Sequence, residues 1–364
     1  MIHMRDMKYR EEEGEESHVF YMEGTRTHDE RCIMYQSGYN EGLRLRVYQD
    51  VKEMNRDLPF FRIESTPNES KKFNIKIGNY IHHDNAGRML YFARYIDQKV
   101  LPYMTSEEIS NLDGYYNIEL HDSYTYLDGD HDKYKNCLVW SKKKGDRSDN
   151  EPILLPDIYH LANYGDKLEK QRDTLSWDEK MDKVGFWGTT TGDRDPRLND
   201  RINKCFWFHR VDPHHEVSDC YITRVAQMTN QQIVEAFPDF HLIFQKYASF
   251  DEQCKYKILI DIPGNTCSWD RVPVILSSNS LLFRFPCTDV CSYYHLMKEY
   301  VHYVPVTEKT VLEKRLYYLQ HPEEAQIIIK NAQRLAQDFC NGRAAQRYMK
   351  GLFRGIVEEE GGKK

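Results

Sequence analysis

Apolar and polar residues in the second half of the chain follow the pattern of an α/β domain. Residues 256–262 (YKILIDI) form a continuous apolar run, which is typical of a buried parallel strand, and small polar residues follow it as a turn. Residues 271–277 (RVPVILS) are compatible with a short helix, with Pro273 near its first turn, and residues 280–285 (SLLFRF) with the next strand. This order of strand, turn, helix and strand predicts a doubly wound α/β domain.

The remainder of the second half continues the alternation. Residues 293–300 have a helical pattern, residues 301–306 (VHYVPV) are typical of a strand, and a long helical tail is expected from residue 308 onward. Proline is tolerated in the first turn of a helix but breaks its interior, so Pro322 should begin a new helix within this tail. We therefore expect the chain to end in helices.

The first half of the chain has weaker signals. Residues 73–77 and 114–120 alternate apolar and polar positions as strands do, whereas residues 86–100 have helical periodicity. A chain of 364 residues is long enough for two domains, and the charged stretch 163–178 is the candidate boundary. We predict a frayed N-terminus at 1–25, an N-terminal domain at 26–175, a C-terminal domain at 176–340, and a C-terminal helix at 341–358 that packs back on the N-terminal domain. Gly342 should interrupt the preceding helix, which leaves residues 345–357 as the last segment.

The composition and charge of the chain limit which binding partners and which cellular compartment are expected. With 50 basic and 57 acidic residues the net charge is −7, which does not favour binding to nucleic acid or to an anionic membrane. The chain has no apolar run of signal-peptide or membrane-span length, so we expect a non-secreted protein of the cytoplasm. The 26 tyrosines suit stacking on sugar rings, although ordinary packing is the simpler explanation.

The nine cysteines favour reduced thiols over a disulfide framework, because their number is odd and their spacing does not repeat. Cys287, Cys291 and His295 have the spacing C-x3-C-x3-H, which would suit zinc. A fourth ligand is not evident from the sequence. We therefore favour buried thiols and expect no metal site.

The turn after the apolar run at 256–262 is a candidate anion site. Open α/β sheets bind phosphate beyond the carboxyl ends of their strands, where backbone N–H groups at a helix N-terminus provide donors. Arg271 opens the predicted helix, and its planar guanidinium suits phosphate oxygens. Turns of this kind also occur in α/β proteins that bind no nucleotide. The turn consists of Gly264, Asn265, Thr266, Cys267 and Ser268.

Residues 184–195 (VGFWGTTTGDRD) form a second candidate, because hydroxyls and free amides there suit phosphate or ribose. An ordinary polar turn is the alternative. The residues concerned are Gly188, Thr189, Thr190, Thr191 and Arg194.

Carboxylates in the first half are candidates for acid–base chemistry. Asp122 follows a predicted strand directly, a position where clefts form, and a carboxylate there could accept a proton from an attacking hydroxyl. A cap or turn role is the alternative for this residue. Asp128, Asp130 and Asp132 (YLDGDHDKYK) resemble the D-x-D of metal-dependent transferases and the start of a calcium loop, but the loop lacks the Gly and Glu at the required offsets. A solvated acidic loop is the simplest interpretation.

Three ordered blocks together resemble glycosyltransferase family 90, which includes Rumi-type protein O-glucosyltransferases and fungal capsule-associated xylosyltransferases. The strongest block spans residues 254–306, with CKYKILIDIPGNTCSWDR, VILSSNSLLF and VHYVPV in the order and spacing of that family. Residues 186–196 (FWGTTTGDRDP) resemble its F-x-G-[ST]-x-T element, and NIELHDS resembles the strand that carries its catalytic aspartate. The resemblance thus covers roughly residues 117–306.

This resemblance implies a GT-B fold, with two Rossmann-like domains that face each other across a cleft and the donor nucleotide in the C-terminal one. It also implies an inverting reaction without a metal or other cofactor, and a UDP-sugar as donor. Asp122 becomes the general base. Thr190 stands where the family often has a basic residue, so Arg194 is a candidate replacement. The implied donor contacts are Gly188, Thr189, Thr191, Gly264, Ser268 and Arg271.

The resulting hypothesis is an enzyme that transfers xylose, or next glucose, from a UDP-sugar to a glycan hydroxyl. Members of the family that act on secreted domains carry secretory signals, so a cytosolic or virus-encoded enzyme that builds a glycan in the host cytoplasm fits better. One alternative is a non-catalytic protein of the same fold that binds glycans or nucleotides. Another is a metal-dependent transferase that uses Asp128 and Asp130.

Overall fold

The chain divides into two compact units, each built around its own β-sheet. In the computed structural model the described residues are 20–24, 47–50, 52–54, 58–65, 73–78, 86–122, 137–144, 152–161, 173–245 and 247–361. The first unit comprises Met1–Ala162 together with Gly342–Lys364, and the second comprises Asn163–Asn341. These compact units are named unit 1 and unit 2, respectively.

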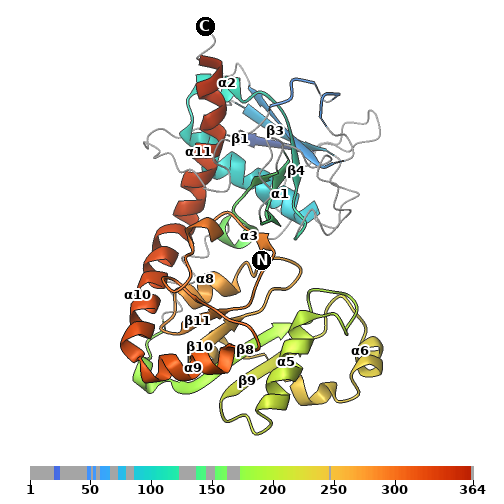
Figure 1. Ribbon diagram of the computed structural model, residues 1–364. Helices are drawn as coiled ribbons and strands as arrows, with labels where there is room; N and C mark the ends of the chain where they lie inside the picture. The colour runs from blue at the N-terminus through green and yellow to red at the C-terminus, as the bar shows by residue number, and fades with distance from the viewer. Residues whose placement is uncertain are drawn as a thin grey trace. The chain divides into compact units, whose positions relative to one another are not determined.

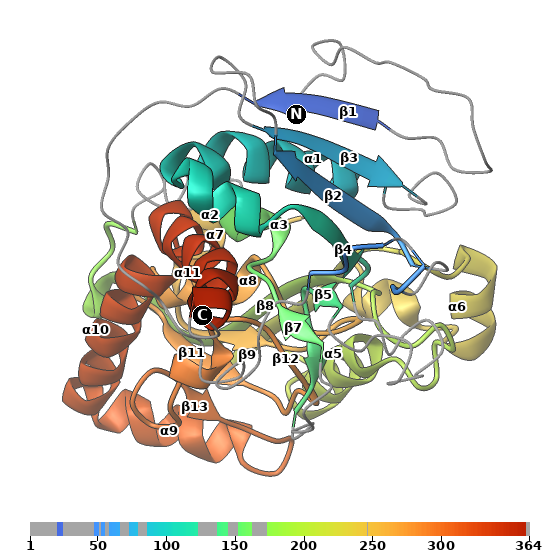
Figure 2. The same ribbon diagram turned by 90° about the horizontal axis from the view of Figure 1, so that it is seen from above.

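Unit 1 contains a six-stranded mixed sheet with the strand order β1-β3-β2-β4-β5-β7. The first four strands in this order pair antiparallel, whereas β4, β5 and β7 pair parallel. Helices α1 and α2 lie on one side of the antiparallel strands (Figure 2). The strands of unit 1 are β1 (Phe20–Gly24), β2 (Phe60–Ser65), β3 (Phe73–Gly78), β4 (Gly114–Glu119), β5 (Leu138–Val139), β6 (Lys142–Lys143) and β7 (Ile153–Leu154).

The helices of unit 1 pack around an aromatic cluster. Phe61 and Tyr116 stack with their ring centroids 4.7 Å apart, and Phe353 from the last helix lies 6.0 Å from Tyr116. That last helix also contacts α2, α3 and η2, so the C-terminus of the chain completes the core of unit 1. The helices are α1 (Ala86–Tyr95), the π-helix η2 (Ile96–Val100), the 3₁₀ helix η3 (Leu101–Tyr103), α2 (Ser106–Asn111), α3 (Ile158–Leu161) and α11 (Gly342–Gly361).

Unit 2 contains a five-stranded sheet in which every pair of neighbours is parallel, with the order β13-β11-β10-β8-β9. Helices cover both faces of a parallel sheet, so the central residues of its inner strands are expected to be apolar. Ile258 and Ile260 of β10 are accordingly buried. The strands are β8 (Met181–Thr189), β9 (Ser218–Arg224), β10 (Tyr256–Asp261), β11 (Leu281–Arg284) and β13 (Val304–Pro305), with a separate short strand β12 (Asp289–Val290).

Helices of unit 2 pack against strands toward both edges of this sheet. Figure 1 shows α5 beside β9, whereas α8 and α10 pack near β11. The α-helices are α5 (Asp200–Val211), α6 (Asn230–Ala236), α7 (Phe250–Gln253), α8 (Arg271–Leu276), α9 (Val311–Gln320) and α10 (Pro322–Phe339), and the 3₁₀ helices are η5 (Trp177–Glu179), η6 (Phe240–Ile243) and η7 (Tyr294–Leu296). No helix in the described residues combines the length and the hydropathy that crossing a bilayer requires.

The predicted α/β fold class is confirmed, because helices accompany a β-sheet in each unit and every pair of neighbouring strands in the unit 2 sheet is parallel. Strands predicted near residues 73, 114, 256 and 280 correspond to β3, β4, β10 and β11, and Pro322 begins α10. The predicted helix at 293–300 is wrong except for η7, and only Val304–Pro305 of the predicted strand at 301–306 is extended. The reason is a turn at Tyr300, whose N–H bonds to the carbonyl of Tyr303 at 2.7 Å.

A buried ion pair joins the amino ends of three strands in unit 2. Lys180, just before β8, donates to Asp173 at 2.6 Å, to the hydroxyl of Ser280 before β11 at 3.2 Å, and to the carbonyl of Cys254 before β10. Asp173 also accepts a hydrogen bond from the backbone N–H of Asn279 at 2.8 Å. The two charged side chains are at most 1 % exposed, so each depends on the other for its solvation.

We predict that Asp173→Ala destabilises unit 2 strongly, because it leaves the Lys180 ammonium buried without its counter-charge. Removing one partner of a buried pair costs roughly 3–5 kcal/mol. The matched control is Asp182→Ala, since the Asp182 side chain is 64 % exposed in its pair with Lys257 and should contribute only about 0–1 kcal/mol. Urea unfolding measures both variants. Equal free energies of unfolding for the two variants would contradict this assignment.

Candidate functional site

Two turns meet at the carboxyl edge of the sheet in unit 2. One follows β8 and the other follows β10, and these strands are neighbours in the sheet. The N–H of Gly192 in the first turn donates to the side-chain oxygen of Asn265 in the second, at 2.9 Å. The structure therefore brings together the two segments that the sequence marked as candidates for phosphate binding.

Arg201 connects these turns from the first turn of α5. Its buried guanidinium donates to the carbonyl of Ile262 at 3.1 Å, to the hydroxyl of Thr191 at 2.5 Å and to the carbonyl of Thr189 at 3.3 Å. Arg201 was not among the residues predicted from the sequence. The sequence contained one signal near Arg201, because Asn199 is a typical N-cap residue. Asn199 accepts a hydrogen bond from the N–H of Ile202 and thereby starts α5 beside the turn that follows β8.

Gly264 allows the close approach of the two turns. A Cβ atom at this position would lie 2.7 Å from the Thr191 hydroxyl oxygen and 2.9 Å from a guanidinium nitrogen of Arg201. Gly188, near the end of β8, is similarly restricted, because a Cβ there would lie 2.5 Å from the ring of Phe186. Both glycines are thus needed for packing within the site.

Arg271 is the first residue of α8 and lies against the end of β8. It donates to the carbonyl of Trp187 at 2.5 Å, and its guanidinium lies 4.5 Å from the centroid of the Phe186 ring. The helix that it opens has only six residues, and its N-cap residue Asp270 makes no side-chain capping bond. The side chain of Arg271 is therefore better suited to contact an anion than the terminus of this short helix is.

The two arginines leave positive charge at this edge of the sheet. Neither Arg201 nor Arg271 has a carboxylate within ion-pair distance among the described residues, whereas the nearby Arg284 pairs with Asp261 at 3.2 Å. Burial, and next the charge of Arg271, lower the pKa of Arg201 to about 10, so Arg201 remains a cation at neutral pH. Asp261 and Asp270 compensate this charge only from a distance. The arrangement is suited to an anion with several oxygens.

The remaining predicted donor residues differ in accessibility. The Thr190 side chain is fully buried and both donates to and accepts from the backbone of Ala226 at 2.8 Å, so it holds the turn rather than facing solvent. Thr189 and Thr191 are partly exposed, with their hydroxyls 3.3 Å apart, and Arg194 is exposed.

In the second turn the side chains mostly point inward. Thr266, Cys267 and Ser268 are buried, whereas Gly264 and Asn265 are partly exposed. The Ser268 hydroxyl oxygen is buried and has no hydrogen-bond partner in the described structure. Burial raises the pKa of the Cys267 thiol, which lies beside Cys287 and Cys291, so a neutral thiol is expected there.

Asp122 lies in unit 1, just after the end of β4. Arg88 of α1 donates to its carboxylate at 3.0 Å and to the carbonyl of Leu120 at 2.9 Å, while Ser141 donates to the backbone carbonyl of Asp122 at 2.6 Å. The carboxylate is one-third exposed and thus accessible to a substrate. Arg88, which orients it, was not singled out from the sequence, because a helical arginine gives no signal of a partner 34 residues away.

Only some of the metal ligands suggested by the sequence are among the described residues. Asp128, Asp130 and Asp132 lie outside the described residues. Among the residues described, no group of three or more His, Cys, Asp or Glu side chains is placed to hold a metal ion, and this includes Cys287, Cys291 and His295. The eight described cysteines are free thiols, seven of them buried.

Comparison with known proteins bears on what this site does. Residues 166–356, just over half of the chain, match the family described as Glycosyl transferase family 90. A curated relative, Protein O-glucosyltransferase 2 of Danio rerio, is 25 % identical over 242 residues, which are 57 % of this chain and 48 % of that protein. The chain thus spans about half the length of this relative.

Two solved structures show a limited similarity to this chain, at low sequence identity. A glycosyltransferase from Rickettsia africae is 11 % identical in sequence, with a TM-score of 0.36. The aligned residues are 65 % of this chain and 66 % of that chain. TarM is 9 % identical in sequence, with a TM-score of 0.39. The aligned residues are 60 % of this chain and 49 % of the TarM chain.

Proposed function

The chain belongs to glycosyl transferase family 90, and from this membership we propose that it transfers a sugar from a UDP-sugar to a hydroxyl group of a glycan. The observation that supports this proposal most directly is the pair Arg201 and Arg271. Among the described residues these two cations have no carboxylate at ion-pair distance, and they lie where parallel strands end, which is the usual place for a nucleotide diphosphate. The proposal covers the donor, the acceptor base and the identity of the sugar.

On the donor side, the arginines would stabilise the departing diphosphate. The bond between the anomeric carbon and the phosphate oxygen breaks, and its electron pair leaves with UDP as negative charge. Guanidinium groups fixed in advance by Ile262, Thr191 and Trp187 need little rearrangement to meet that charge. Such preorganised electrostatic stabilisation is commonly the largest single contribution to catalysis.

On the acceptor side, we assign the general base to Asp122. An acceptor hydroxyl forms the new bond to the anomeric carbon and transfers its proton to the Asp122 carboxylate, and attack from the face opposite to UDP inverts the configuration. The hydrogen bonds from Arg88 and Ser141 hold this residue in one orientation. Its partial exposure leaves room for the hydroxyl group.

The donor sugar is xylose in our proposal, with glucose as the second candidate. Xylose follows from the resemblance to transferases that build capsular glycans. Glucose is supported by the relative from Danio rerio, which is named as an O-glucosyltransferase. The two sugars differ by one hydroxymethyl group, and a difference of this size changes binding by only about 1–3 kcal/mol.

We expect Arg271→Ala to weaken the binding of UDP by roughly 10- to 100-fold, because a hydrogen bond to a charged group contributes about 1.5–3 kcal/mol. Isothermal titration calorimetry with UDP measures this change. Arg197→Ala is the matched control, since Arg197 is an exposed arginine in the turn after β8 and should alter affinity less than twofold. Unchanged affinity in Arg271→Ala would place the diphosphate elsewhere.

Asp122→Asn should reduce turnover by about 10²–10⁴-fold, since the amide cannot accept the proton of the acceptor hydroxyl. The affinity for UDP should stay within twofold of wild type, because this residue contacts the acceptor only. Transfer is followed as UDP release with a glycan acceptor, and Asp178→Asn, an exposed carboxylate, serves as the matched control. An Asn variant with full activity would remove Asp122 from the mechanism.

A screen of UDP-xylose, UDP-glucose, UDP-galactose and UDP-N-acetylglucosamine tests the donor. We predict the fastest UDP release from UDP-xylose, then from UDP-glucose, with rates that change less than twofold in EDTA. Loss of activity in EDTA would instead favour a metal-dependent reaction. Absence of UDP release from every sugar, with UDP binding intact, would indicate a protein that binds nucleotides without catalysis.

A further inference from the structure

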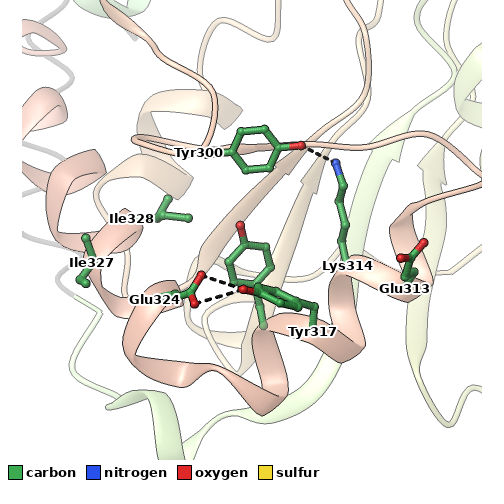
Figure 3. A pocket seen from close by; sticks show the side chains of 8 residues that line it. Tyr300, Glu313, Lys314, Tyr317, Glu324, Ile327 and Ile328 are labelled. Carbon is green, nitrogen blue, oxygen red and sulfur yellow. Dashed lines mark hydrogen bonds between the residues drawn. The ribbon is translucent and has the colours of Figure 1, made fainter.

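A hollow of about 500 Å³ lies along the outer edge of unit 2, apart from the donor residues. None of its lining residues belongs to the donor turns, which follow β8 and β10. Its volume falls in the range of sites for small molecules. The side chains that line it come from the turn before β13 and from α9 and α10, and are Tyr300, Glu313, Lys314, Tyr317, Tyr318, Glu324, Ile327 and Ile328 (Figure 3).

Tyr300 enters this hollow from a strained backbone. Its φ angle is +59°, a left-handed conformation that bulky side chains adopt only where the surrounding structure imposes it. The ring is nevertheless half-exposed, and its hydroxyl accepts a hydrogen bond from Lys314 at 2.9 Å. Backbone strain of this kind is found at ligand-binding sites, and here it fixes the position of an exposed aromatic ring.

Tyr317 lies across the hollow from Tyr300 in the view of Figure 3 and is also fixed although exposed. Its hydroxyl lies 3.1 Å from both carboxylate oxygens of Glu324. Its ring stacks on His321 with a centroid distance of 4.2 Å. Two tyrosines thus offer ring surface that loses little conformational entropy when a ligand binds.

The charges in the hollow disfavour an anionic ligand. Glu313 and Glu324 are negative, and the only cation among the lining residues, Lys314, already donates to Tyr300 and to the carbonyl of Pro305. A nucleotide or phosphate would meet net negative charge there. A neutral ligand with hydroxyl groups could donate to the two carboxylates instead.

We propose that this hollow is a second carbohydrate-binding site, which holds neutral pyranose rings of a glycan. The C–H faces of such rings match the tyrosine rings and Ile327, and their hydroxyls match Glu313 and Glu324. The identification of this glycan with the acceptor rests on the proposed function. Sugar binding as such does not depend on it.

Titration calorimetry of the full chain with xylohexaose and cellohexaose, each compared with its free monosaccharide, tests this site. We expect at least one hexasaccharide to bind, and Tyr317→Ala to weaken that binding tenfold or more. Tyr247→Ala is the matched control, because Tyr247 is the most exposed of the tyrosines in the described structure, at 72 %, and does not line the hollow. Binding of the hexasaccharide alone assigns the site to a glycan chain, and binding of the monosaccharide as well assigns it to single rings; both support the proposal.

The variant Tyr300→Gly distinguishes a role of Tyr300 in carbohydrate binding from a role in the stability of the fold. Glycine relieves the left-handed strain, so the thermal midpoint should not fall, whereas carbohydrate affinity should fall tenfold or more. UDP affinity should be unchanged in both tyrosine variants, which keeps this result distinct from the test of the donor site. Failure of all four sugars to bind wild type, or equal binding by wild type and Tyr317→Ala, would overturn the proposal.

Discussion

The two turns at the carboxyl edge of the unit 2 sheet depend on one buried guanidinium. A buried cation must be hydrogen-bonded, and Arg201 meets this need with two backbone carbonyls and the hydroxyl of Thr191, which together fix both turns. These partners carry no full charge, so they satisfy its geometry without neutralising it. Gly264 has no room for a side chain because Arg201 occupies that space. With Arg271 added, the same constraint that shapes the turns also leaves a site for an anion.

Much of unit 2 was predictable because its signals are local. The apolar run of β10, the short helix at Arg271 and the proline that begins α10 each follow from neighbouring residues. The roles of Arg201 and Arg88 could not be found in this way, since they depend on partners 61 and 34 residues distant in sequence. Only the start of α5 beside Arg201 has a local signal, which is the N-cap residue Asn199. The segment before β13 misled the prediction because residues 293–300 have a helical pattern in sequence, whereas Tyr293 and Tyr294 are buried in irregular structure around a short 3₁₀ turn.

The two units divide the proposed chemistry between them. Unit 1 supplies a carboxylate held by Arg88, and unit 2 supplies cations held by backbone carbonyls. In each unit the reactive group is oriented by residues that belong to the scaffold, which is the arrangement expected for preorganised catalysis. The hollow at Tyr300 extends this division, because the ligand chemistry that it favours is neutral and the chemistry at Arg271 is anionic.

The central claim is that Arg201 and Arg271 receive the diphosphate of the donor. A crystal structure of the chain with bound UDP tests it most directly. Our account predicts phosphate oxygens within about 2.7–3.2 Å of the guanidinium of Arg271, with Arg201 next to them or linked through the hydroxyl of Thr191. A diphosphate bound away from both arginines would contradict the account.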